Sequence, residues 1–277
     1  MPDTHHTDDT VRGLLQFTIP TGEIPVTQVN PTGGGRDDPK TGNYEMREVT
    51  VQNGRPISDE LNLEIDGFEF HEHKTVVTDF TDNEQIENIY YPELEKLLLN
   101  VTGAEKILIF DHTIRIGDPE KRSKLGVRDP VRSAHNDFTD RSAIQRVKDL
   151  LPASEAEERL ERRFTSINVW RPLIGPVKID PIAICPWDSI GPEDMIPAER
   201  VYNDRVGGIL NLSYNPKQRW TYFPDMQSDE VILLKCFDTL RDGRARWTAH
   251  ASFENPDGID PKLPPRESIE VRTLIFY

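Results

Sequence analysis

Apolar residues recur with two different periods along the chain, and the change of period predicts where helices give way to strands. Between Asn83 and Asn100 they lie at helical spacing, at Ile86, Ile89, Tyr90, Leu94, Leu97 and Leu98. Pro92 falls inside this segment, so we expect a kinked or divided helix. The run KILIF at 106–110 predicts a buried strand, and HTIRI at 112–116 its continuation or its partner.

Two further helices are predicted after residue 137. The first has its apolar positions on one face, at Ile144, Val147 and Leu150. Thr139 or Asp140 provides its N-terminal cap, and Ser154 and Glu157 form an S-x-x-E capping box for the second helix. From residue 166 onward the pattern changes to short strands, predicted at SINVW, GILNLSY, VILLKCF, RWTAHASF and SIEVRTLIFY.

Helices followed by a run of strands indicate an α+β, mainly β protein, whose sheets pack as a sandwich or barrel rather than as alternating β-α units. Residues 20–60 are rich in Gly, Pro, Asn and Asp, and the stretch PTGGGRDDPKTG cannot form a regular element without breaks. We therefore expect one domain over residues 1–277. Its first part, 1–84, is predicted to be a loop-rich N-terminal arm, and 85–277 the core with its supporting helices.

Composition narrows the class of protein. With 277 residues and 36% apolar content the chain can bury a substantial core, but no apolar run approaches the roughly 20 residues that span a bilayer. The first residues, MPDTHHTDDT, lack the features of a signal peptide, and two distant cysteines, Cys185 and Cys236, agree with a reducing compartment. We expect a cytoplasmic protein.

The net charge of −15 argues against nucleic acid and anionic membranes as partners, since both require surplus Lys and Arg. A small-molecule substrate is the expected partner, and a homodimer is compatible with the sequence. Any anionic ligand must be bound by a local group of basic residues.

The stretch SAHNDFTD places His135 two positions before Asp137, which puts both side chains on one side of an extended backbone. An imidazole and a carboxylate at this spacing occur often by chance, so a third ligand is needed. His250 is the candidate, because it lies on the polar face of the strand RWTAHASF. A core histidine bonded to a backbone carbonyl is the alternative at that position.

Arg266 and Ser268 stand two apart at the start of the last predicted strand, so both can point into one pocket. A guanidinium fork with a neighbouring hydroxyl suits a carboxylate. Arg272 shares the same strand face and competes for this role. We prefer Arg266 because Pro264 and Pro265 help fix its approach, Ser268 lies beside it, and its spacing from His250 suits a neighbouring strand. Arg272 is expected to pair with Glu270 or another acidic group. Two histidines and one carboxylate on one face of Fe(II) would leave three positions for 2-oxoglutarate and O2, as in non-haem iron oxygenases.

In this order, H-N-D, a distal histidine and R-x-S resemble the iron(II)/2-oxoglutarate-dependent oxygenases. The strings INVWRPL, RWTYFPDMQSDEVILLKCFD, HASF and RESIEVR are similar to the branch with cephalosporin 7α-hydroxylase, fungal meroterpenoid oxygenases and gibberellin desaturase-like proteins. The resemblance covers about residues 85–277. It implies a double-stranded β-helix, or jelly-roll, with helices packed against one sheet.

The resemblance further implies a dioxygenase of secondary metabolism that hydroxylates or otherwise oxidises a natural product, with succinate and CO2 as co-products. His135, Asp137 and His250 would then bind Fe(II), and Arg266 and Ser268 would hold 2-oxoglutarate. Candidates for the substrate or for supporting bonds are Asn168, Trp170, Arg219 and Tyr222. A non-catalytic jelly-roll binding protein and a metal-dependent hydrolase are the alternatives.

Overall fold

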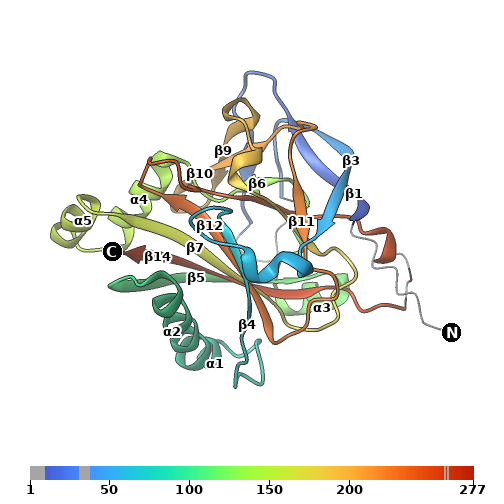
Figure 1. Cartoon of the computed structure of the whole chain (residues 1–277), viewed down its shortest axis with the longest axis horizontal. Helices are drawn as coiled ribbons and strands as arrows, with labels where there is room; N and C mark the ends of the chain where they lie inside the picture. The colour runs from blue at the N-terminus through green and yellow to red at the C-terminus, as the bar shows by residue number, and fades with distance from the viewer. Residues whose placement is uncertain (1–9, 31–37, 259, 261) are drawn as a thin grey trace.

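The protein is built from two curved β-sheets with helices on the outside (Figure 1). The structure is a computed structural model that describes residues 10–30, 38–258, 260 and 262–277. Within these residues the strands form a nine-stranded and a five-stranded sheet. Short 3₁₀ turns connect them at η1 (Arg55–Glu60), η3 (Trp187–Ser189), η4 (Pro192–Asp194) and η5 (Pro256–Gly258).

The five-stranded sheet is antiparallel and has the order β4-β12-β7-β14-β5. Its strands are β4 (Phe68–Glu72), β5 (Lys106–Ile116), β7 (Phe164–Pro172), β12 (Glu230–Asp238) and β14 (Glu267–Phe276). KILIF and HTIRI lie in the single strand β5, so the second is the continuation of the first. The register with β14 shifts between Arg272 and Thr273, which leaves Phe110 as an extra residue in β5.

The nine-stranded sheet has the order β1-β3-β11-β8-β13-β6-β10-β9-β2. Its strands are β1 (Thr10–Ile19), β2 (Val26–Gln28), β3 (Asn43–Asn53), β6 (His135–Asn136), β8 (Ile182–Cys185), β9 (Met195–Val201), β10 (Val206–Leu212), β11 (Trp220–Tyr222) and β13 (Ala249–Ser252). Buried residues of both sheets pack in one cluster, for example Ile184 of β8 with Trp170 of β7 and Leu234 of β12. The sheets therefore enclose a common core, and the predicted mainly β jelly-roll is confirmed.

The two faces of β14 have different partners. Ile269 and Val271 pack in an apolar cluster that includes Leu94 and Leu98 of the helix α2. The residues between them, such as Ser268 and Glu270, point to the opposite face because successive strand residues alternate. This alternation places the polar residues of β14 inside the jelly-roll.

The outer helical layer begins with α1 (Asn83–Gln85), a π turn η2 (Ile86–Tyr90) and α2 (Tyr91–Thr102). The helical run is continuous from Asn83 to Thr102, but the π turn interrupts its α-helical pattern just before Pro92, in line with the predicted kinked or divided helix. α2 ends at Gly103, whose φ of 63° is the left-handed conformation that glycine adopts readily. Figure 1 shows α2 lying beside β5.

The remaining helices are α3 (Pro119–Leu125), α4 (Asp140–Leu150) and α5 (Ala153–Leu160). Thr139 caps α4 as predicted, since its side chain accepts from the N–H of Ser142. The capping box predicted for α5 is wrong. Pro152 occupies the cap position, and Ser154 lies inside the helix. None of the described helices combines the length and apolar character that crossing a membrane requires.

The prediction of a loop-rich arm over 1–84 is also wrong for the part that the structure describes. β1 and β3 pair along ten residues, from Thr10 opposite Gln52 to Ile19 opposite Asn43, and β4 pairs with β12. In β3 the only fully buried side chains are Val49 and Val51, because its other positions carry polar or partly exposed residues. The stretch 31–37 of PTGGGRDDPKTG lies outside the described residues.

Candidate metal centre

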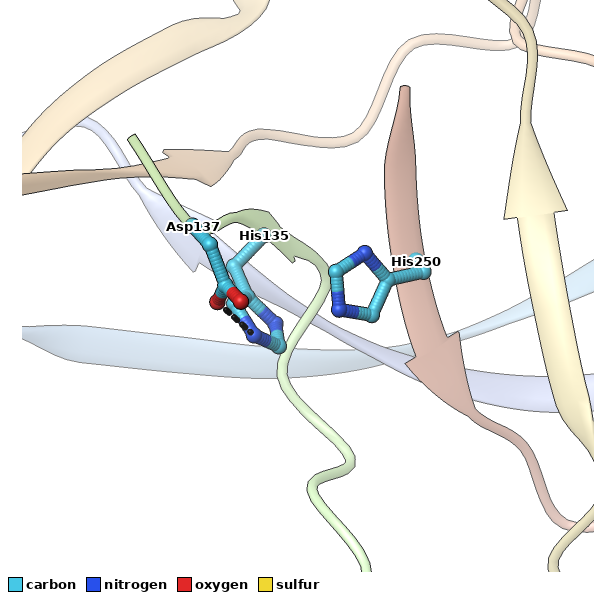
Figure 2. Close-up of side chains that lie close together, drawn as sticks. All are labelled: His135, Asp137 and His250. Atoms are coloured by element: carbon cyan, nitrogen blue, oxygen red, sulfur yellow. Dashed lines mark ion pairs between the residues drawn. The ribbon is translucent and has the colours of Figure 1, made fainter. Parts of the chain in front are cut away.

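His135 and His250 are brought together by strand pairing. The two-residue strand β6 lies between β10 and β13, and His135 stands directly opposite His250 in the register. Side chains at opposed positions of neighbouring strands lie on the same face. The centres of the two imidazole rings are 4.6 Å apart, and Figure 2 shows the His250 ring directed toward His135 and Asp137.

One possible ligand atom from each of His135, Asp137 and His250 lies within 4.8 Å of the others. Nδ1 of His135 donates to the backbone carbonyl of Ser133 at 2.8 Å, which orients Nε2 to 3.4 Å from Oδ1 of Asp137. Such a bond from the second ring nitrogen is common in metal-bound histidines, because it fixes the tautomer and the ring orientation. The sequence prediction that these three residues meet is correct in geometry.

The other oxygen of Asp137 is held from the five-stranded sheet. Oδ2 accepts a hydrogen bond from the side-chain amide of Asn168 at 2.7 Å and from Nε of Arg272 at 3.2 Å. Oδ1 is thereby left facing the histidines. Asn168 also donates to Oε1 of Glu270 at 2.8 Å, so it ties together two carboxylates.

The electrostatic surroundings favour the protonation states that metal ligands need. Burial alone would raise the pKa of Asp137, but the positive charge of Arg272 and the hydrogen bond with His135 hold it well below its usual range. Burial, followed by the neighbouring His135, lowers the pKa of His250 to about 4. An ionised carboxylate and a neutral imidazole are the forms that coordinate a divalent ion.

Glu270 is a polar residue of the site that the sequence prediction treated only as a partner of Arg272. It is buried, its Oε1 lies 3.8 Å from Nε2 of His250, and its Oε2 accepts from Nη2 of Arg272 at 3.0 Å. Burial would raise its pKa, but the charge of Arg272 keeps it below the usual range. The signal was present in the sequence, because R-E-S-I-E-V-R puts position 270 on the same strand face as 266 and 268.

Arg266 and Ser268 are both buried on this inner face. Nη1 of Arg266 donates to the carbonyl of Asp180 at 2.5 Å and to Oγ of Ser252 at 3.1 Å, and its guanidinium lies 5.5 Å from the Trp170 ring centre. The hydroxyl of Ser268 has no hydrogen-bond partner among the described residues. Leaving a buried hydroxyl unpaired costs about 1–3 kcal/mol, so the site fits a bound ligand with acceptor oxygens.

The four residues predicted to contact the substrate or to support the site differ in how close they lie to the candidate ligands. Trp170 packs in the core between the sheets and, as noted, lies against Arg266. Tyr222 packs edge-on against Phe253 at 5.3 Å within another apolar cluster. Arg219 is half-exposed and pairs with Asp188 at 2.5 Å. Of these four residues, only Asn168 has a recorded hydrogen bond to a candidate ligand, namely Asp137. The positions described for Arg219 and Tyr222 give no support to a substrate role.

The chain is similar to known proteins over most of its length. A protein-family model described as an oxidoreductase/YMDC permease-like domain matches residues 15–276. A hydroxylase/desaturase, CTB9, from Cercospora beticola is 30% identical over 84% of this chain and 78% of its own length. The Fe(II)/2-oxoglutarate-dependent dioxygenase nvfI from Aspergillus novofumigatus is 30% identical over 90% of this chain and 94% of its own.

Among solved structures, the iron and alpha-ketoglutarate-dependent endoperoxidase NvfI superimposes with a TM-score of 0.85 and 28% identity. The superposition covers 98% of this chain and 99% of that one. The chain belongs to this family of Fe(II)/2-oxoglutarate-dependent oxygenases. The similarity starts near residue 15 rather than 85, so the N-terminal strands are part of it. Membership favours the oxygenase over the binding-protein and hydrolase alternatives.

Proposed function

We propose that this protein is an Fe(II)/2-oxoglutarate-dependent dioxygenase that oxidises a small natural-product molecule, with hydroxylation as the default outcome. The observation that carries the proposal is the cluster of His135, Asp137 and His250, whose ligand atoms lie within 4.8 Å of one another inside the jelly-roll. Relatives with this fold are named as hydroxylases, desaturases and an endoperoxidase, so related chains differ in the outcome of the oxidation.

In this proposal His135, Asp137 and His250 hold Fe(II), and Arg266 with Ser268 holds the distant carboxylate of 2-oxoglutarate. When bound, the metal and this cosubstrate supply the oxidation of substrate by O2, with succinate and CO2 as co-products. The unpaired hydroxyl of Ser268 supports the placement of the cosubstrate, since a carboxylate would accept its proton.

The chain itself orients the ligands and keeps water from them. Ser133 fixes the His135 ring, and Asn168 and Arg272 fix the Asp137 carboxylate from the opposite sheet. Burial of both histidines and of Arg266 limits the access of solvent. These contacts preorganise the site before any ligand arrives.

The test is an anaerobic titration of the Fe(II)-loaded protein with 2-oxoglutarate. We expect a weak visible charge-transfer band that saturates with the cosubstrate, and that is absent from His250→Ala. His71→Ala is the matched control, because His71 lies on β4 and pairs with Glu69. Bound metal without any such band would favour a hydrolase or a binding protein instead.

Three sequence predictions remain part of the proposal. The match over residues 15–276 supports one oxygenase domain. The two cysteines are unpaired and buried, which supports a reducing, cytoplasmic location. A homodimer is retained as a prediction that a measurement of molar mass in solution would decide.

A further inference from the structure

Two clefts open beside the candidate metal centre. The larger, of about 500 Å³, is lined by Asp137 and Arg272, and the smaller, of about 220 Å³, by His135. The two share the same dividing wall, formed by Arg115, Arg128, Arg200 and Ile209. His135 and Asp137 therefore each line a cleft, and three of the four residues that these clefts share are arginines.

The three arginines come from separate parts of the chain. Arg115 lies in β5, and its backbone bridges to that of Arg128, which follows α3. Arg200 lies in β9 and pairs with Thr27 of β2. Because three elements converge on one wall, the cluster results from the tertiary fold and not from a local run of basic residues.

No salt bridge joins these arginines to a carboxylate among the residues that the structure describes, although the charge of Glu270 acts on Arg115. Nη1 of Arg115 donates to the carbonyl of Asp129 at 3.0 Å, and Nη2 of Arg128 to the carbonyl of Asn30 at 3.0 Å. No side-chain bond of Arg200 to another described residue is recorded. Both recorded bonds leave most of each guanidinium fork without an acceptor.

Carboxylates are in excess in the chain, since the sequence has 48 acidic and only 33 basic residues. Several partly buried arginines pair with them, such as Arg163 with Asp238 at 2.6 Å and Arg246 with Asp140 at 2.5 Å. The buried Arg171 is satisfied by neutral groups instead, since it donates to Tyr90, Ser228 and His73. Arg115, Arg128 and Arg200 have neither a salt bridge nor such a set of acceptors among the described residues.

Arg115 is the innermost of the three, with 6% of its surface exposed, and it stands opposite Ser268 in the register of β5 and β14. Burial lowers its pKa to about 10. Glu270 opposes this change, while the positive charges of Arg272, Arg200 and Arg128 add to it. The charges are thus close enough to repel one another, and a bound anion would offset this repulsion.

We propose that Arg115, Arg128 and Arg200 bind a carboxylate group of the primary substrate, which is therefore an organic acid. The remainder of the substrate would lie in the larger cleft beside Asp137. That cleft has the volume of a small-molecule site, and Phe110, Val127 and Phe138 give it apolar lining for a carbon skeleton. This inference rests on the proposed function, and it identifies the class of substrate.

The test uses benzoate and benzamide as probes, since they share a ring small enough for either cleft and differ in charge. The full-length protein is first saturated with Zn(II) and 2-oxoglutarate, so that the metal and Arg266 are occupied. Binding of each probe is then followed by calorimetry and by the shift in melting temperature. Failure of 2-oxoglutarate to bind in the first step would contradict the proposed function. It would not test the anion site at Arg115, Arg128 and Arg200.

We expect benzoate to bind at least 10-fold more tightly than benzamide. Arg128→Gln and Arg200→Gln should each weaken benzoate roughly 10-fold to 100-fold, the effect of losing a charge-assisted bond, with benzamide and 2-oxoglutarate unaffected. Arg200→Lys should restore part of the affinity. Both glutamine variants should fold, because they remove repelling charges.

Arg162→Gln is the matched control, because Arg162 is an exposed residue that pairs with Glu105. It should behave like the unmodified protein. Equal binding of benzoate and benzamide, no binding of benzoate, or benzoate affinity unchanged in both Arg128→Gln and Arg200→Gln would overturn the proposal.

Discussion

Nε of Arg272 donates a hydrogen bond to Oδ2 of Asp137 across 3.2 Å, and Nη2 of the same guanidinium donates to Glu270 at 3.0 Å. The guanidinium group of Arg272 is therefore hydrogen-bonded to two buried carboxylates of the protein. Burial would lower the pKa of Arg272, but these carboxylates and Asp111 raise it well above its usual range. It is a positioning residue for Asp137, and the assignment of the cosubstrate carboxylate to Arg266 is preferred for that reason.

Arg272→Gln should destabilise the fold and weaken metal binding together. The change leaves Asp137 and Glu270 buried next to each other without the guanidinium that bonds to both, and breaking a buried ion pair costs about 3–5 kcal/mol. Thermal unfolding and metal content after dialysis measure the two effects. Arg272→Lys, which keeps the charge, should recover part of the stability, and an unchanged melting temperature in Arg272→Gln would contradict the role described.

Arg266→Gln should instead act on the cosubstrate. Losing the charge-assisted hydrogen bonds between a guanidinium and a carboxylate costs about 2–4 kcal/mol. This corresponds to a rise of roughly 30-fold to 1000-fold in the KM for 2-oxoglutarate. Metal content should be preserved, because Arg266 donates to Asp180 and Ser252, which are not candidate metal ligands. Steady-state kinetics with varied 2-oxoglutarate measures the effect, and an unchanged KM would move the carboxylate site elsewhere.

His135→Ala and His250→Ala should each abolish turnover and bound iron, since two remaining protein ligands hold the ion poorly. Asp137→Ala should do the same, although an added small anion can occupy the space of the lost carboxylate and restore some binding. Iron per chain, measured on folded protein, is the readout. Near-normal iron and rate in His250→Ala would show that the third ligand is misassigned.

The sequence was most informative where one pattern had a single structural meaning. The alternation in β14 and the helical spacing before Asn100 predicted real elements, because each apolar face packs against a partner. The order of H-x-D and a distal histidine predicted which three candidate ligands meet. His135 and His250 lie close together because they pair on neighbouring strands. This pairing depends on the strand order, which could not be derived from their spacing in the sequence.

Other parts of the fold could not be predicted because their signal is weak. β1 and β3 carry charged residues on their exposed positions, and Arg12 pairs with Glu48 across them, so neither resembles an apolar strand. The group of three arginines between the two clefts was missed for a related reason. Arg115, Arg128 and Arg200 are far apart in the sequence, and nothing in their neighbourhoods indicates that they converge.

The two cysteines were expected to be buried in the core like small apolar residues. Cys185 and Cys236 are fully buried in β8 and β12, and both are free. Burial raises the pKa of Cys185 to about 12 and that of Cys236 well above its usual value. A raised thiol pKa keeps the unreactive protonated form dominant, so near pH 8 almost no thiolate is present in the folded protein.

Iodoacetamide should leave both residues unmodified under native conditions and alkylate both in guanidinium, as measured by intact mass. Rapid labelling of either cysteine in the native protein would show that its strand opens or that its thiol is accessible.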